Sequence, residues 1–352
     1  MTSRAPMLPA DIRTARTEHA KLRDRDFAEK FQISEAQLVA AYVGHGVTRV
    51  SAAPDDLMPQ ICDLGEVMAL TRNTSCVIEK VGKYENYHSG QHASMILTEA
   101  IDLRFFPRHF VSAFAVERPG DDGPKRSIQI FDAAGDAVHK VHLRPNSNID
   151  AYTQLINKLA LEDQSAEQPV EPRKPAEAPK ADPEKAEMLR SEWTKMTDTH
   201  QFMRLTSKLK MNRLGAYRIA GEPFVRALAP EAVNTMLHAA RDQAVEVMIF
   251  VGNMGCIEIH GGPIQTLREM GRWQNILDPG FDLHLRRDHI AEVWAVNKPT
   301  QRGDAVSVEA FDAEGGLILQ VFGRRTEAKD HRPAWNTLVA DLESLPVTEP
   351  AE

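Results

Sequence analysis

Cysteine and aromatic residues are scarce in this sequence, and each shortage excludes a class of protein. The 352 residues include only three cysteines, Cys62, Cys76 and Cys256, which are far apart and form no CxxC pair. Such an odd, scattered set predicts neither a disulfide framework nor a zinc site built from thiolates. Aromatic residues make up 6% of the chain, and no cluster of them indicates a surface on which bases would stack.

Long apolar runs and an excess of positive charge are also missing. No apolar run approaches the roughly 18 residues of a membrane-spanning helix, and residues 1–25 contain no apolar core of a secretory signal. We therefore expect a cytoplasmic protein. The formal net charge of −8 argues against a nucleic-acid partner, which would require a basic surface.

Motifs for common catalytic chemistry are absent. The glycines at 252–255 and 261–263 lack the Lys-Ser/Thr end of a phosphate-binding loop, and no dinucleotide-binding motif is present. No nucleophile elbow is found. His88, His92 and His260 have a spacing that matches no standard zinc site.

A proline-rich segment divides the chain into halves of similar length. It contains Pro169, Pro172, Pro175, Pro179 and Pro183 among Glu, Lys and Ala. With so little apolar content it cannot form a core, which is typical of a semi-rigid linker. The prediction is a first domain at 1–162, a linker at 163–186 and a second domain at 187–352, in line with the length of the chain.

The two halves resemble each other at a constant shift of 180 positions. Residues 101–104 (Ile-Asp-Leu-Arg) match 281–284 (Phe-Asp-Leu-His), and 131–135 (Phe-Asp-Ala-Ala-Gly) match 311–315 (Phe-Asp-Ala-Glu-Gly). A fixed offset over many positions indicates an internal duplication, and two copies indicate tandem domains rather than a solenoid.

Both halves follow the same order of predicted elements. Helical sequence comes first, at 27–43 with Ser34 as the N-cap and at 198–220. Alternating apolar stretches follow and end in the hairpin signals at 132–135 and 312–315. The stretches are 76–78, 110–116, 127–131 and 137–143 in the first half, and 245–251, 290–296, 307–311 and 317–322 in the second. Closing helices are predicted at 148–160 and 332–342. The fold class is therefore α+β, a tandem duplication of a domain with a large antiparallel β-sheet flanked by helices.

His200 is the first candidate for chemistry. Thr197, Asp198 or Thr199 can cap the helix that follows, so we expect His200 in its first turn. The partial positive charge at a helix N-terminus favours the neutral imidazole, which is the form that binds metals. A surface histidine beside a cap is the alternative, and the residue alone does not decide between them.

Basic residues near predicted strand ends are the second set of candidates. Arg213, Lys298, Arg324 and Arg325 have the chemistry to bind carboxylates, although each taken alone fits a solvated surface charge better. Arg104 follows Leu103 and precedes two phenylalanines, and it matches His284 in the repeat. A guanidinium in such an apolar setting needs a partner, either a ligand or a structural ion pair with Asp102 or Glu117.

Taken together, these segments resemble the HemS/HmuS/ChuS family of bacterial cytoplasmic haem-binding proteins. The resemblance covers nearly the whole chain. It is carried by residues 197–202 (Thr-Asp-Thr-His-Gln-Phe), 251–257 (Val-Gly-Asn-Met-Gly-Cys-Ile), 101–106 (Ile-Asp-Leu-Arg-Phe-Phe) and 320–323 (Gln-Val-Phe-Gly).

The resemblance implies that haem b binds in a cleft beside the second half, with iron ligated by His200. It gives Arg104 and Phe106 a distal position, so Arg104 and His200 would carry any catalysis. Arg213, Lys298, Gln320 and Arg325 match positions that hold the propionates or close the pocket. Two departures are Leu319, where the family often has Tyr, and His260, where relatives have an apolar residue.

Three functions remain open at this point. The chain could degrade haem with electrons from a partner protein, since it lacks a dinucleotide motif. It could instead be a haem chaperone that accepts haem from an inner-membrane ABC importer and delivers it to a separate haem oxygenase. The third function is that of a tandem-domain protein without a cofactor. The resemblance favours haem uptake and iron acquisition, without deciding between degradation and delivery.

Overall fold

The helical sequence that opens the first half forms two helices where one was predicted. In the computed structural model, which describes residues 7–345, α2 (Asp24–Phe31) ends at Gln32, whose φ of 55° is left-handed. The next helix, α3 (Glu35–Ala40), begins after Ser34, whose Oγ accepts the N–H of Gln37 at 3.1 Å. Ser34 is therefore the N-cap that the sequence predicts.

The second half repeats this break. Residues 198–220 form α7 (Gln201–Lys208) and α8 (Arg213–Ala220) rather than one helix. Lys210 is left-handed at φ 59°, and the side chain of Asn212 caps α8 by accepting the N–H of Gly215 at 3.0 Å. The break in the first half coincides with the predicted N-cap Ser34, whereas the break in the second half was not predicted, because apolar periodicity continues through it.

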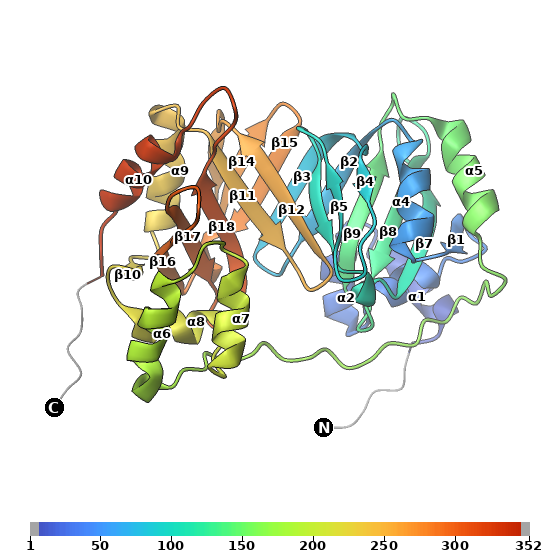
Figure 1. The fold of residues 1–352 in the computed structure, drawn as a ribbon. Coiled ribbons are helices and arrows are strands. Elements are labelled where there is room, and N and C mark those ends of the chain that lie inside the picture. The colour runs from blue at the N-terminus through green and yellow to red at the C-terminus, as the bar shows by residue number, and fades with distance from the viewer. Residues whose placement is uncertain (1–6, 346–352) are drawn as a thin grey trace. The chain divides into compact units, whose positions relative to one another are not determined.

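Each half builds an antiparallel sheet with the same strand order (Figure 1). In the first half the order is β1-β7-β8-β9-β2-β3, and in the second it is β10-β16-β17-β18-β11-β12. The first set is β1 (Val47–Val50), β2 (Glu66–Arg72), β3 (Cys76–Lys83), β7 (Ser112–Arg118), β8 (Lys125–Phe131) and β9 (Ala137–Leu143). The second set is β10 (Val225–Leu228), β11 (Val247–Gly252), β12 (Cys256–Gly262), β16 (Glu292–Lys298), β17 (Ala305–Phe311) and β18 (Leu317–Gly323).

The predicted hairpins join β8 to β9 and β17 to β18. Gly135 (φ 78°) and Gly315 (φ 86°) occupy the left-handed positions of these turns, where a residue without Cβ is favoured. The registers match between the copies, since Ile128 is opposite Val141 and Val308 is opposite Val321. The structure thus confirms the duplicated α+β fold.

Elements without a clear sequence signal complete the fold. Short strands form the groups β4-β5-β6 and β13-β14-β15, and helices cover the sheets. The strands are β4 (Tyr87–His88), β5 (Ser94–Leu97), β6 (Asp102–Phe105), β13 (Leu267–Met270), β14 (Trp273–Asp278) and β15 (Phe281–Arg286). The helices are α1 (Pro9–Glu18), α4 (Pro54–Cys62), α5 (Ile149–Leu159), α6 (Ala186–Thr194), α9 (Ala232–Asp242) and α10 (Arg332–Ala340), with 3-10 turns η1 (Pro107–His109), η2 (Pro183–Lys185) and η3 (Arg287–His289).

The chain forms two compact units whose boundary lies inside the proline-rich segment, between Lys174 and Pro175. Each unit also includes a short piece of the other half: residues 252–258 belong to unit 1 and residues 73–77 to unit 2. Residues 161–182 contain no helix or strand, yet Arg49 Nε holds this segment in unit 1 by donating to the carbonyl of Ser165 at 2.7 Å. Within residues 7–345, no helix is both long and apolar enough to cross a membrane.

Candidate functional site

His200 lies directly before α7, one residue outside the helix in which it was expected. Its side chain is 93% exposed. The carboxylate of Asp198 lies 2.7 Å from Nδ1 of His200 and also accepts its backbone N–H at 2.7 Å. These two contacts lower the pKa of Asp198. An ionised carboxylate only accepts hydrogen bonds, so Nδ1 carries a hydrogen, and in the neutral imidazole Nε2 has the lone pair that a metal would use.

The residues around His200 fix its position on unit 2. The side chain of Gln201 accepts the N–H of Thr197 at 2.9 Å, which closes the turn before the helix. Phe202 is buried against Trp193 and Tyr217, with ring centroids 4.5 and 5.5 Å away. Phe202 is therefore a buried anchor two residues after His200, and it fixes the backbone that holds the His200 imidazole at the surface.

A buried charged cluster underlies this part of unit 2. Glu309 of β17 accepts from Arg213 at 2.8 Å, from Lys298 at 2.8 Å and from the hydroxyl of Tyr217 at 2.9 Å. Lys298 also donates to the Tyr217 hydroxyl at 2.9 Å, and its ammonium lies 5.0 Å from the centre of the Phe202 ring. The sequence predicted Arg213 and Lys298 as site residues, and the structure brings them together through Glu309.

Burial and charge oppose each other in this cluster. Burial lowers the pKa of Lys298 to about 8, although Glu309 opposes that change. Burial would raise the pKa of Glu309, yet Lys298 and Arg213 hold it well below the usual range. Glu309 is therefore an anion near neutral pH, and it is the counter-charge of buried Lys298 and half-buried Arg213.

The alternative of solvated charges is wrong for Lys298, which is 3% exposed. Its ammonium already has two partners, so a direct contact with a propionate stays a prediction. Arg213 is more accessible at its second nitrogen, where Nη2 lies 3.7 Å from Sδ of the exposed Met203. Sequence reasoning missed Glu309, although its place between Val308 and Ala310 on an apolar strand was a signal of burial.

A half-buried sheet face continues from Glu309 across unit 2. Gln320 of β18 is opposite Glu309 on one side and Phe250 on the other. Phe250 and Phe322 pack edge to face with ring centroids 5.4 Å apart. Directly opposed residues share a face of the sheet, so this face offers aromatic surface beside the amide of Gln320.

The remaining predicted cation lies just after β18. Arg325 is exposed and its backbone bridges to Asp330, so its guanidinium is accessible to a ligand. The neighbouring Arg324 instead donates to Glu246 at 2.7 Å.

The two departures from the family pattern have structural explanations. Leu319 is 1% exposed and lies opposite buried Ala310. It therefore points to the face of β18 away from Gln320, and no contact between Leu319 and the Gln320 face is expected. His260 stacks on Phe281 with ring centroids 3.6 Å apart, which gives it a packing role.

Arg104 and Phe106 belong to unit 1. Arg104 Nη1 pairs with Asp102, its side chain is 31% exposed, and it also donates to the carbonyl of Leu103 at 3.1 Å. The pairing with Asp102 is one of the two alternatives left open by the sequence. Glu117 instead binds Arg126. Phe106 is half-buried, and its N–H donates to Gly255 at 2.9 Å. A distal position for both residues stays a prediction.

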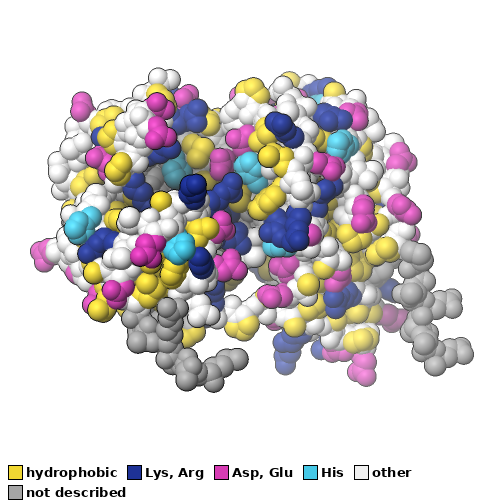
Figure 2. Space-filling view, turned by 180° about the vertical axis from the view of Figure 1, so that it is seen from behind, with side chains coloured by type: hydrophobic (Ala, Val, Ile, Leu, Met, Phe, Trp, Pro, Cys, Tyr) yellow, Lys and Arg dark blue, Asp and Glu magenta, His cyan; other side chains and the backbone are white. Residues whose placement is uncertain are grey.

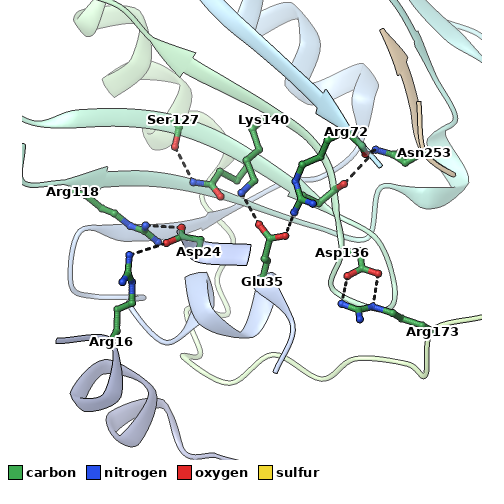
Figure 3. A network of polar contacts seen from close by, with 12 residues as sticks. Arg16, Asp24, Glu35, Arg72, Arg118, Ser127, Asp136, Lys140, Arg173 and Asn253 are labelled. Atoms are coloured by element: carbon green, nitrogen blue, oxygen red, sulfur yellow. Dashed lines mark hydrogen bonds and ion pairs between the residues drawn. The ribbon is translucent and has the colours of Figure 1, made fainter. Parts of the chain in front are cut away.

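The matching part of unit 1 has the opposite arrangement of charge (Figure 3). The first residue of α3 is Glu35, where α8 has Arg213, and it pairs with Arg72 and Lys140. Lys140 lies opposite Gln129, as Gln320 lies opposite Glu309. The position before α2 is Arg23, where α7 has His200. Because a guanidinium keeps its proton and has no lone pair for a metal, unit 1 lacks this ligand.

The side chains that the structure describes do not assemble a metal centre of their own. Among residues 7–345, no group of three or more His, Cys, Asp and Glu residues is placed to hold a metal ion. Acidic and basic side chains are interspersed over the face shown in Figure 2. The candidate residues of unit 2 thus offer one exposed imidazole, an aromatic face and two accessible arginines, and these groups have the chemistry to bind a planar, anionic ligand that brings its own metal.

Known proteins are similar to this chain in both sequence and fold. The family model described as the haemin-degrading HemS.ChuX domain matches residues 32–159 and 210–342. The hemin transport protein HmuS of Yersinia pestis is 37% identical over 331 residues, 93% of this chain and 95% of that protein.

Two solved structures are similar over almost the whole chain. Holo-PhuS, a heme-binding protein from Pseudomonas aeruginosa, has a TM-score of 0.91 and 37% identity, covering 96% of this chain and 100% of PhuS. ChuS, an Escherichia coli heme oxygenase, has a TM-score of 0.83 and 32% identity, covering 93% of this chain and 98% of ChuS. With two matching domains and relatives of this identity, the chain belongs to the HemS/ChuX family.

Proposed function

We propose that this protein binds haem b on unit 2, with Nε2 of His200 as the iron ligand. The observation that carries the proposal is the exposed imidazole whose Nδ1 is held by Asp198 at 2.7 Å. Metal-ligating histidines commonly donate their other N–H to a carboxylate, which fixes the ring and raises its basicity. The names of the relatives, a hemin transport protein and a heme-binding protein, support the same ligand.

The other residues act on the macrocycle. Phe250 and Phe322 supply apolar surface for the porphyrin plane, while Gln320 offers an amide at its edge. Arg213 and the exposed Arg325 neutralise the propionates, since a guanidinium matches a carboxylate in two hydrogen bonds. Lys298 contributes by keeping Glu309 ionised and Arg213 in place. Arg104 and Phe106 line the distal side in this proposal.

The biological role that fits is bacterial haem uptake and iron acquisition in the cytoplasm. The chain would accept imported haem from an inner-membrane ABC importer and pass it on. An exposed ligand supports transfer, because a partner can approach the iron without unfolding the site. A haem oxygenase would be the recipient.

Titration with haemin tests this function. Absorption spectra should show a saturable Soret band at one equivalent of haem per chain. A linear, non-saturating rise, like that of haemin with an unrelated protein, would contradict the proposal.

Degradation is the second candidate, favoured by the similarity to an E. coli heme oxygenase. Haem supplies the oxygen chemistry when bound, and Arg104 would donate hydrogen bonds on the distal side. The electrons must come from a partner or an added reductant. Incubation of the haem complex with ascorbate and catalase separates the candidates. Formation of a defined linear tetrapyrrole supports degradation, whereas a Soret band that persists only when catalase is present supports delivery.

A further inference from the structure

The last part of the proline-rich segment is docked on unit 2, although it contains no helix or strand. Residues 177–180 (Glu-Ala-Pro-Lys), here called the strap, lie against the start of α8. The N–H of Lys180 donates to Oδ1 of Asn212 at 2.9 Å, and the N–H of Asn212 donates to the carbonyl of Lys180 at 3.1 Å. Nδ2 of Asn212 also donates to the carbonyl of Ala178 at 2.8 Å. Asn212 therefore holds the strap at two points.

Gly215 provides the space that the strap occupies. It is buried in the first turn of α8. A Cβ at this position would lie 2.7 Å from the backbone nitrogen of Lys180 and closer still to its carbonyl. Because the obstacle is backbone rather than a flexible side chain, any other residue at position 215 would displace the strap. Glycine is unfavourable within a helix, so the close approach of the strap explains why it stands here.

Unit 1 has a different arrangement at the matching helix. Ser34 caps α3 where Asn212 caps α8, and the third residue of α3 is Gln37 where α8 has Gly215. Oε1 of Gln37 accepts the N–H of Ser34 at 2.9 Å, which completes a capping box with side chains alone. The two copies thus differ at this point, and the glycine that admits the strap belongs to the half that carries His200.

Asn212 connects the strap to the proposed haem site. Its Oδ1 also accepts the N–H of Gly215 at 3.0 Å, which fixes the first turn of α8. The next residue is Arg213, whose Nη1 donates to Glu309 at 2.8 Å and whose side chain is 23% exposed. Residues two apart on a helix point to different sides, so the strap supports α8 from a side that Arg213 does not use. A fixed backbone lowers the entropy that Arg213 loses when it binds a carboxylate.

We propose that the strap is a positioning element of the haem site, which fixes the start of α8 so that Arg213 meets a haem propionate. Asn212 and Gly215 are positioning residues, since they act through Arg213. This inference rests on the proposed haem function. Because the coupling between two binding events is reciprocal, bound haem also holds the strap in its seat.

Gly215→Ala separates the strap from the helix. Alanine is the better helix former, so α8 itself is not weakened, while the strap loses its seat. The affinity for haemin should fall about tenfold. The affinity for haemin dimethyl ester, which has no propionate charge for Arg213 to bind, should stay within about twofold of the native value.

Other results of these titrations would refute the positioning role. Equal losses for haemin and its dimethyl ester would mean that the variant disturbs the whole site rather than Arg213. Native haemin affinity in Gly215→Ala would show that the strap has no effect, and would leave the haem function standing. A native chain that binds no haemin would refute the haem function, and the role of the strap with it.

Asn212→Ser distinguishes the strap from the helix cap. Serine keeps a side-chain oxygen that can cap α8, but it lacks the amide that donates to Ala178. It should show the same selective loss for haemin as Gly215→Ala. The matched control is Asn148→Ser at the cap of α5 in unit 1, where Oδ1 accepts the N–H of Ala151 at 3.0 Å. Similar losses in both variants would assign the effect to capping and contradict the role of the strap.

Trypsin tests the reciprocal effect on the native chain. Cleavage after Lys180 requires the strap to leave Asn212, so haemin should slow it about tenfold. Cleavage after Arg173, in the part of the proline-rich segment that pairs with Asp136 of unit 1, should not change. Mass spectrometry of the fragments gives both rates. An unchanged rate of cleavage after Lys180 would show that haem and the strap are not coupled, and would overturn the proposal.

Discussion

One carboxylate oxygen of Asp198 accepts hydrogen bonds from both the backbone N–H and the ring Nδ1–H of His200, each at 2.7 Å. This arrangement orients an exposed imidazole that would otherwise rotate freely, and it determines which ring nitrogen can bind iron. Asp198 is therefore expected to matter for haem binding without touching haem.

Asp198→Ala should weaken haem binding by about 10–100-fold, the usual effect of removing a carboxylate that orients a metal-bound histidine. The measurement is haemin titration, together with the rate of haem transfer to apomyoglobin. The control is Asp242→Ala, which removes another exposed aspartate of unit 2 that pairs with Arg241. An affinity equal to that of the native chain would show that the Asp198 contact does not orient the ligand.

Glu309→Gln should destabilise unit 2 by about 3–5 kcal/mol, because it leaves Lys298 and Arg213 without their buried counter-charge. Urea unfolding followed by tryptophan fluorescence measures the change in unit 2, because all four tryptophans, Trp193, Trp273, Trp294 and Trp335, lie there. The matched control is Glu292→Gln at the half-exposed pair with Arg218, where the cost should stay below about 1 kcal/mol. Similar losses in the two variants would mean that burial does not strengthen the Glu309 cluster.

Glu258 should make stability depend on pH in the opposite sense from most carboxylates. It is 0% exposed, and burial raises its pKa to about 8, although Thr71 and Lys80 oppose that change. The folded chain keeps this proton while the unfolded chain loses it near pH 4.5. Protonated Glu258 therefore contributes its full share to the free energy of unfolding below pH 4.5, and this contribution is lost as the pH rises to about 8.

Glu258→Gln removes this dependence. The free energy of unfolding of the variant, relative to the native chain, should rise by about 1.4 kcal/mol for each pH unit between pH 5 and 8. Urea unfolding at several pH values measures it. A difference that stays constant over this range would mean that Glu258 titrates alike in the folded and unfolded chains.

Arg104→Ala should leave folding and haem affinity largely intact but change the sixth coordination position of the iron. The Arg104 side chain is 31% exposed, so the loss of its pair with Asp102 should cost less than about 1 kcal/mol. Resonance Raman spectra of the ferric complex report the sixth ligand. Unfolding of the variant, with no spectral change in the remaining folded protein, would assign Arg104 a structural role.

The sequence predicted much of this fold because each element of the duplicated domain occurs twice, so one copy supports the prediction for the other. The fixed offset identified matching strands, and Ser34, Gly135 and Gly315 had the residue types that their caps and turns require. The break between α7 and α8 was missed since Lys210 adopts a left-handed conformation for which its residue type has no preference.

The site was predicted less completely, because its contacts join residues far apart in the chain. Arg213, Lys298 and Glu309 meet only after three elements pack, so the sequence predicted the two cations as site residues without showing that Glu309 joins them. The sequence also left the direction of the Leu319 side chain open, since one step along a strand moves a side chain to the other face of the sheet. His200 could be predicted as a candidate because its helix start and its carboxylate are local.

Imidazole rescue of His200→Ala is the most direct test of the central claim. Native protein should bind one equivalent of haemin with the spectrum of a histidine complex. His200→Ala should lose that spectrum and recover it when free imidazole is added, whereas His92→Ala, at another exposed histidine, should match the native chain. A native spectrum in His200→Ala without imidazole would contradict the assignment of His200 as the iron ligand.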